Sequence, residues 1–287
     1  MAIIALIFDF DDTLVPDSTT LLLRKYGIDP EVFWKTKWQS LITSGYDPAL
    51  ACLNLLLDNI GEGKPLGPLT NSDLNTFGAE LQDKFYPGLP ELFDFLREFV
   101  SQKVQDVSIE FYIISGGLQE IIEASPFIRE NFKGVYASQL ASDTPNGVLK
   151  HIKRCVTFTE KTRYLFEINK GILPKDTIKR PYAVNEDVPK ENRRVKIHNM
   201  IYVGDGLTDI PCFSLVLKER GIPLGIIKAE DPKSTVIQLL APRRVVSAHL
   251  PNYNDDHELG IVIRNIVATF CTRIEIDRAS AIRSQNL

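Results

Sequence analysis

The stretch IIALIFDFDDT, residues 3–13, decides the fold of this chain. The apolar run Ile3–Phe8 is followed abruptly by three carboxylates, Asp9, Asp11 and Asp12. The run is too short for a core helix, so it predicts a strand buried on both faces in the middle of a parallel sheet. Ligands bind at the carboxyl ends of such strands, and crowded carboxylates there repel one another unless a cation or a shared proton relieves them. The alternative is a strand that simply ends in solvent.

Composition is typical of a soluble globular protein. The 287 residues suffice for about two domains, and 44% of them are hydrophobic and 24% charged. A net charge of -4 gives no reason to expect nucleic acid or an anionic membrane as a partner. No segment approaches the roughly 20 apolar residues of a membrane span. Four isolated cysteines and the lack of a basic leader indicate residence in the cytoplasm.

Residues 16–86 contain no convincing strand. Turn signals such as Gly27 and Gly61 separate segments with helical patterning. The predicted helices are Thr19–Tyr26, Pro30–Ser44, Pro48–Asn59 and Ser72–Phe85. We therefore predict an all-helical domain, the helical insert, over residues 16–86. Residues 1–15 and 87–287 would form an α/β core around a Rossmann-like parallel sheet.

The later strands alternate with helices, which is the pattern of parallel βαβ crossovers. The predicted strands are Ser108–Ile114, Asn199–Val203, Pro223–Ile227 and Arg244–Val246. The first of these ends in Ser115-Gly116-Gly117, and a helix is predicted to begin at once, over Leu118–Glu123.

The ends of three predicted strands carry complementary chemistry. They present the carboxylates Asp9 and Asp11, the hydroxyl and amides of Ser115–Gly117, and the carboxylates Asp205 and Asp209. Parallel strands would bring these groups to one edge of the sheet. Oxygen ligands without a nearby histidine or cysteine favour a hard cation, most simply Mg²⁺, and amides at a helix start favour an anion. A metal beside an anion pocket predicts a phosphate site.

In this order, the residues resemble the four motifs of the haloacid dehalogenase superfamily of phosphohydrolases. The motifs are Asp9-Phe10-Asp11-Asp12-Thr13, Ser115 closing an apolar strand, a lysine, and Gly204-Asp205-Gly206-Leu207-Thr208-Asp209. The resemblance covers residues 1–15 and about 87–275, and it implies that the helical insert is a C1-type cap domain. The Ser-Gly-Gly and Gly-Asp-Gly sequences are most similar to the phosphoserine-phosphatase-like branch.

The resemblance implies catalytic roles for the first two motifs. Asp9 would attack phosphorus and form an aspartyl-phosphate. Asp11 would protonate the leaving oxygen and then activate water. Thr13 would orient the Asp11 side chain. Ser115 and the Gly116 amide would bind the transferring oxygens.

The resemblance also implies a Mg²⁺ site. Asp9, the backbone carbonyl of Asp11 and Asp205 would hold the ion. Asp209 would stand outside these ligands and fix the lysine or a metal-bound water. Asp12 receives no catalytic role and is expected to shape the turn.

The third-motif lysine has four candidates. They are Lys150, Lys153, Lys161 and Lys170. Lys161 heads a predicted helix, Glu160–Asn169, at the place where the family's lysine usually precedes a helical pattern, so it is the predicted residue. An ammonium paired with Asp9 would keep that nucleophile ionised.

The sequence thus predicts a cytoplasmic, Mg²⁺-dependent phosphomonoesterase for a small phosphorylated metabolite, with the helical insert closing over the site. Neither nucleic acid nor a membrane is expected as a partner, and the expected state is a monomer or homodimer. Phosphoserine is not implied as the substrate, because Thr208 stands where phosphoserine phosphatases usually have asparagine.

Two further functions remain open at this point. One is a phosphotransferase or mutase that uses the same aspartyl-phosphate, and the other is a non-catalytic phospho-ligand-binding protein. Substrate choice is expected to depend on side chains of the helical insert such as Arg24, Lys25, Trp34, Lys35 and Trp38.

Overall fold

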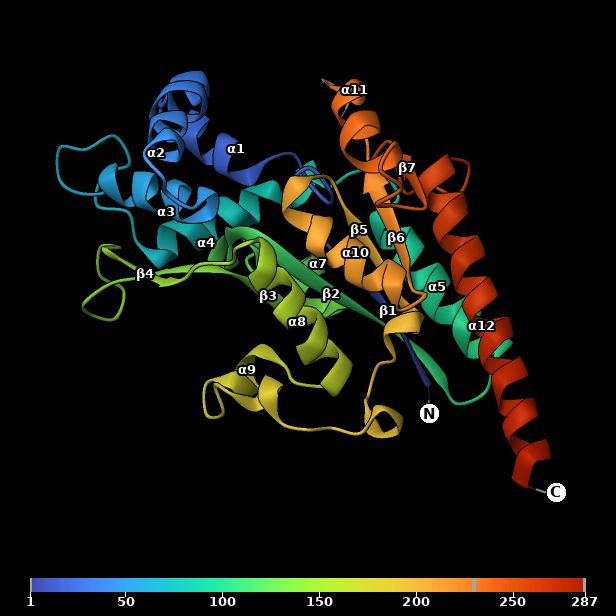
Figure 1. Ribbon diagram of the computed structural model, residues 1–287. Helices are drawn as coiled ribbons and strands as arrows, with labels where there is room; N and C mark the ends of the chain where they lie inside the picture. Colours follow the sequence, from blue (N-terminus) through green and yellow to red (C-terminus); the bar gives the residue numbers. More distant parts are fainter. Residues whose placement is uncertain (1, 229–230, 286–287) are drawn as a thin grey trace.

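The computed structural model describes residues 2–228 and 231–285, whose strands form a seven-stranded sheet (Figure 1). The strand order is β4-β3-β2-β1-β5-β6-β7, and all neighbours are parallel except β3 and β4. The strands are β1 (Ala2–Phe8), β2 (Val107–Leu118), β3 (Phe132–Ala141), β4 (His151–Arg154), β5 (Met200–Gly204), β6 (Ile222–Ile226) and β7 (Ser247–His249). The predicted α/β fold with a parallel-sheet core is confirmed.

Strand β1 lies in the middle of the sheet and is buried on both faces, as its apolar run predicts. It pairs with β2 on one side and with β5 on the other. Its side chains alternate between two hydrophobic cores, with Ile4, Leu6 and Phe8 in one and Ile3, Ala5 and Ile7 in the other. A residue that directly follows β1 is therefore placed at the centre of the sheet's carboxyl edge.

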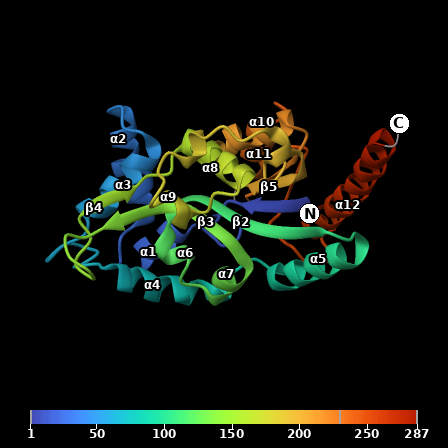
Figure 2. The same ribbon diagram turned by 90° about the horizontal axis from the view of Figure 1, so that it is seen from below.

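Helices cover both faces of the sheet (Figure 1 and Figure 2). The first core contains side chains of α5 (Leu89–Lys103), α7 (Pro126–Asn131) and α12 (Glu258–Gln285), and the second contains side chains of α8 (Phe158–Lys170) and α10 (Ile210–Lys218). The rings of Phe93 in α5 and Phe111 in β2 stack with centroids 4.0 Å apart. Two short helices, α9 (Pro174–Thr177) and α11 (Pro232–Thr235), lie in connections. Across the described residues, no helix is both long and apolar enough to cross a membrane.

The helical insert lies beyond the carboxyl end of β1, on the side away from the N terminus (Figure 1). Its helices are α1 (Ser18–Lys25), the π-helix η1 (Val32–Trp38), α2 (Gln39–Thr43), α3 (Pro48–Asp58), α4 (Asn71–Glu80) and the 3₁₀ helix η2 (Leu81–Lys84). Asp17 and Asp47 cap α1 and α3 by accepting hydrogen bonds from the first free amides. Apolar side chains of the insert form a third core, to which Leu118 and Leu140 of the sheet also contribute.

The end of β2 differs from the sequence prediction. A helix was predicted from Leu118, whereas β2 continues to Leu118 and α6 is a single turn, Gln119–Ile122. The strand continues because β2 keeps pairing with β3 past a bulge, where Leu118 lies opposite Ser138. Ser115, Gly116 and Gly117 therefore belong to a strand, and the helix that follows begins one residue later than predicted.

The last strand begins later than predicted. The sequence predicts a strand over Arg244–Val246, but β7 begins at Ser247. At this point the chain is still turning, because Arg243 has a left-handed backbone (φ 56°) and the Arg244 amide donates to the Leu239 carbonyl.

Candidate active site

Three carboxylates converge at the carboxyl edge of the sheet. Asp9 directly follows β1, while Asp205 and Asp209 follow the neighbouring strand β5. Because β1 and β5 are parallel neighbours, one oxygen of each carboxylate lies within 4.8 Å of the others. Asp9 and Asp209 are buried, and Asp205 is partly buried. The structure thus brings together residues from the two ends of the predicted motif set.

Lys161 reaches these carboxylates from the first turn of α8. Its Nζ lies 2.8 Å from Asp9 Oδ2, 2.8 Å from Asp209 Oδ1 and 3.2 Å from Thr208 Oγ1. The side chain is 1% exposed. Two of the other candidates point elsewhere, since Lys150 pairs with the exposed Asp143 and Lys170 donates to backbone carbonyls of the connection after α9. Lys161 is therefore the candidate lysine that the fold places against Asp9.

The three carboxylates of this cluster carry more charge than the Lys161 ammonium can neutralise. Burial alone would lower the pKa of Lys161, but Asp209 and Asp9 raise it above its ordinary value, so the ammonium stays charged. Burial raises the pKa of Asp9, and the Lys161 ammonium opposes that rise. One ammonium shared by two buried carboxylates, with Asp205 nearby, leaves a net negative charge that a further cation would offset.

The Asp209 carboxylate already has protein partners, with Lys161 among them. Its Oδ1 also accepts a hydrogen bond from the Tyr202 hydroxyl at 2.7 Å, and its Oδ2 lies 3.4 Å from the Gly206 amide. A Cβ at Gly204 would come within 2.5 Å of Asp209 Oδ2, so only glycine fits there. Asp9 and Asp205 are therefore the carboxylates of the cluster best placed to receive a cation.

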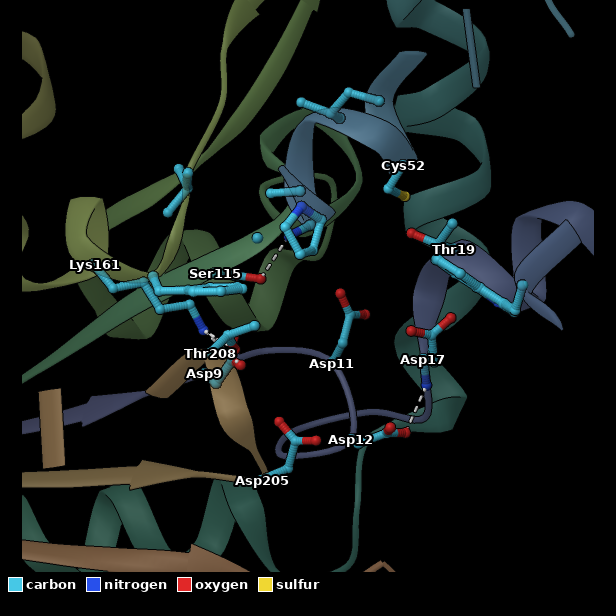
Figure 3. A pocket seen from close by; sticks show the side chains of 18 of the residues that line it. Asp9, Asp11, Asp12, Asp17, Thr19, Cys52, Ser115, Lys161, Asp205 and Thr208 are labelled. Atoms are coloured by element: carbon cyan, nitrogen blue, oxygen red, sulfur yellow. Dashed lines mark hydrogen bonds and ion pairs between the residues drawn. The ribbon is translucent and has the colours of Figure 1, made fainter. Parts of the chain in front are cut away.

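Asp11 lies in the turn after β1, and its carboxyl group points into a cavity (Figure 3). Its Oδ1 accepts a hydrogen bond of 2.7 Å from the Ser18 amide at the start of α1. Burial raises the pKa of Asp11 to about 7, and the neighbouring Asp17 adds to the rise. A carboxyl group with this pKa can both donate and accept a proton near neutral pH.

Gly117 fixes the position of the Asp11 carboxyl group. A Cβ at Gly117 would lie 2.7 Å from Asp11 Oδ2, whereas a Cβ at Gly116 would meet nothing closer than the Val156 carbonyl at 3.9 Å. We expect Gly117→Ala to displace Asp11 and to lower kcat for a phosphomonoester on the order of 100-fold. Gly116→Ala, the matched control, is expected to cause a smaller loss, and equal losses in the two variants would contradict this assignment.

Ser115 and Thr13, two other predicted site residues, are both buried near the site, but their hydroxyl groups differ in their hydrogen bonds. Ser115 is buried and lines the same cavity as Asp9, and its Oγ accepts a hydrogen bond of 2.9 Å from the Gly117 amide. Thr13 is also buried, but its Oγ1 has no hydrogen-bond partner among the described residues. The structure thus brings Ser115 to the site and records no hydrogen bond by which the Thr13 side chain would orient Asp11.

Sequence comparison identifies a relative of the chain. No protein-family model matches. An uncharacterised protein of Borreliella burgdorferi is 30% identical in an alignment of 239 positions that covers 75% of this chain and 78% of that protein. The chain belongs to the same family as this Borreliella protein.

Solved structures show the fold to which this chain is similar. A HAD family hydrolase from Salmonella enterica serovar Typhi has a TM-score of 0.56 at 14% identity, and the match covers 86% of this chain and 67% of the hydrolase. A substrate-bound phosphoserine phosphatase has a TM-score of 0.54 at 12% identity, with 92% of this chain and 99% of that one covered. A probable phosphoserine phosphatase from Vibrio cholerae has a TM-score of 0.55 at 15% identity, with coverages of 94% and 66%. The chain has the haloacid dehalogenase (HAD) fold.

Lys228 of this HAD core is a site residue that the sequence motifs did not predict. This residue follows β6, and its Nζ lies 2.6 Å from Asp205 Oδ2 and 2.7 Å from Asp12 Oδ2. Asp12, which received no catalytic role, also accepts a hydrogen bond of 3.0 Å from the Asp17 amide and has a left-handed backbone (φ 55°). The predicted strand ending at Ile227 was the available signal, because a residue just beyond it must reach the same edge of the parallel sheet.

A cavity of about 240 Å³ separates the HAD core from the helical insert. The core side carries the carboxylates and lysines described above. The insert contributes Asp17, Thr19, Trp34, Trp38, Pro48, Ala49, Cys52 and Leu53. In Figure 3, Cys52 lies across the cavity from Asp9 and Asp205, with Asp11 between them. The arrangement can hold a phosphate group at the sheet edge and the rest of a ligand against the insert.

Proposed function

We propose that the protein hydrolyses phosphomonoesters by transferring the phosphoryl group to Asp9. The observation that carries this proposal is the contact of Asp9 with the buried Lys161, with the Asp11 carboxyl group on the same cavity. The names of the structural neighbours, phosphoserine phosphatases among them, support phosphoryl chemistry on this fold.

The residues of the chain divide the reaction between them. An oxygen of Asp9 forms a bond to phosphorus while the bond from phosphorus to the leaving oxygen breaks, and Asp11 gives its proton to that oxygen. Asp11 then accepts a proton from water as the water oxygen attacks phosphorus and releases Asp9. Lys161 offsets the negative charge that gathers between Asp9 and the phosphoryl group.

Ser115 and Gly116 are proposed to bind the transferring oxygens. The Ser115 oxygen accepts a hydrogen bond from the Gly117 amide, so its own O–H proton is free to be donated to a phosphoryl oxygen. Both residues line the cavity beside Asp9.

The donor set fits Mg²⁺. Asp9 and Asp205 offer carboxylate oxygens within 4.8 Å of each other, the donors that a hard divalent cation prefers. The backbone carbonyl of Asp11 is the proposed third ligand from the chain. When bound, the ion would neutralise charge on the phosphoryl oxygens.

Lys228 is expected to compete with Mg²⁺ for Asp205. Its ammonium lies 2.6 Å from the carboxylate oxygen that the ion would need and adds a repelling positive charge. We therefore expect Lys228→Met to tighten Mg²⁺ binding on the order of tenfold, measured by calorimetric titration of the protein with Mg²⁺ alone. Lys25→Met, which removes an ammonium paired with Glu80 in the helical insert, is the control and should leave the affinity unchanged. Unchanged or weaker binding by Lys228→Met would contradict the competition.

The direct test of the proposed function is release of inorganic phosphate. The purified protein should hydrolyse p-nitrophenyl phosphate in Mg²⁺ and lose this activity when the ion is chelated. No release from p-nitrophenyl phosphate or from a panel of phosphorylated metabolites, despite tight binding of one of them, would favour the non-catalytic alternative. A small metabolite as substrate, residence in the cytoplasm and a monomeric or homodimeric state stay predictions.

A further inference from the structure

The part of the cavity that faces the helical insert has no free positive charge. Lys161 and Lys228 are the lysines among its described lining residues, and each is already paired with two carboxylates. Arginine is absent from the described lining. Lys25 and Lys35, which the sequence suggested for substrate choice, form ion pairs with Glu80 and Glu31 and do not line the cavity. A second anionic group on a substrate would find no partner here.

Two tryptophans give this part of the cavity an aromatic wall. Trp34 and Trp38 are four residues apart on η1, and their rings meet edge to face with centroids 6.0 Å apart. Both indole N–H groups are occupied, by Thr20 Oγ1 at 2.9 Å and by the Pro48 carbonyl at 3.0 Å. The rings therefore offer carbon and π surface to a ligand and no hydrogen-bond donor.

A carboxylate lies on the same cavity. Asp17 lines it at the start of α1 and forms no ion pair among the described residues (Figure 3). Burial raises the pKa of Asp17, so a cation bound beside it would favour the ionised form of this carboxyl group. Cys52 adds no charge, because burial raises the pKa of its thiol. The leaving-group side of the cavity thus combines an aromatic wall with one carboxyl group, and no unpaired cation lies among its described lining residues.

We propose that the substrate is the phosphomonoester of an alcohol that carries a methylated ammonium group, seated between the Trp34–Trp38 wall and Asp17. This inference rests on the proposed phosphatase function. A methylated ammonium is a cation with an apolar surface, which aromatic faces attract through their negative π density. It needs no hydrogen-bond donor from the protein, which these rings do not provide, and its charge is offset by Asp17.

The test compares three phosphomonoesters under steady-state conditions in Mg²⁺. They are phosphocholine, its neutral carbon isostere with a tert-butyl group in place of the trimethylammonium group, and phosphoserine. We expect kcat/KM for phosphocholine to exceed that for the isostere about tenfold, because only the charge differs. Phosphoserine should also be poorer than phosphocholine, because its carboxylate would lie near Asp17 and both lysines of the described lining are already paired.

Two variants locate the effect in the cavity. Asp17→Asn keeps the helix cap and removes the charge, and Trp34→Leu keeps apolar volume and removes a π face. Each should bring the ratio of kcat/KM between phosphocholine and the isostere close to one. Lys35→Ala is the matched control on η1, outside the cavity, and should keep the ratio of the unmodified protein.

The outcomes separate this inference from the proposed function. Turnover of p-nitrophenyl phosphate without a preference for phosphocholine over the isostere would overturn the substrate class alone. A preference that survives in both Asp17→Asn and Trp34→Leu would also overturn it. Turnover of none of the esters would overturn the phosphatase function and the inference with it.

Discussion

Replacing Asp9 by asparagine is expected to lower kcat for p-nitrophenyl phosphate by at least about 10³-fold. An amide is a poor nucleophile toward phosphorus, and Asp9 is the carboxylate that the centre of the sheet presents to the cavity. The variant should stay folded, because Lys161 keeps its 2.8 Å contact with Asp209. The measurement is p-nitrophenolate release in saturating Mg²⁺.

The stability of Asp9→Asn separates loss of chemistry from loss of structure. The pKa of Asp9 is raised by burial and by its carboxylate neighbours despite the opposing ammonium, so its ionised form is costly to bury. We therefore expect no loss of unfolding free energy in urea. A folded Asp9→Asn variant that turns over at the rate of the unmodified protein would contradict the assignment of Asp9.

Replacing Lys161 by methionine is expected to cost both stability and activity. Lys161, Asp9 and Asp209 are all nearly inaccessible to solvent, with side-chain exposures of 1%, 7% and 0%. Removing the ammonium leaves two buried carboxylates facing each other, which should lower the free energy of unfolding by about 3–5 kcal/mol. Urea titration measures this loss. Phosphate release should fall with it, because the charge that offsets the phosphoryl group is gone.

Two further variants show whether the loss is electrostatic. Lys150→Met removes an exposed ammonium paired with Asp143 and should change stability by less than about 1 kcal/mol. Adding Asp209→Asn to Lys161→Met removes one of the two repelling carboxylates, so the double variant should be more stable than Lys161→Met alone. A double variant less stable than the single one would show that the effect comes from packing instead.

The central strand of the sheet could be predicted from the sequence. Six apolar residues ending in carboxylate leave few options other than a buried central strand, and β1 is that strand. The carboxyl edge of a parallel sheet then brings Asp9 and Asp205 together whatever the intervening chain does. This part of the site follows from topology alone.

The contacts that depend on side-chain reach could not be derived in the same way. Four lysines lay in the window for the third motif, and the structure places Lys161 against a carboxylate 152 residues earlier in the chain. Lys228 was missed because the sequence analysis grouped only three strand ends. The strand through Ser115–Gly117 was missed because glycines usually end a strand, whereas here pairing with β3 continues past them.

The side chains of the helical insert that face the active site could not be predicted from the sequence either. Its helices can be recognised from capping residues and turn signals, but a helix pattern does not say which face meets the active site. The sequence listed three basic and two aromatic side chains as candidates for substrate choice. The structure places Trp34 and Trp38 on the cavity, and Lys25 and Lys35 in ion pairs elsewhere.

The most direct test of the account is to trap the phosphoryl group on the protein. Asp11→Asn should still react with p-nitrophenyl phosphate, because p-nitrophenolate leaves without a proton, but it should lack the base that activates water. Rapid acid quenching followed by mass spectrometry of peptides should then find one phosphoryl group on Asp9. A phosphoryl group on any other residue, or steady phosphate release with no phosphoryl group on the protein, would contradict transfer through Asp9.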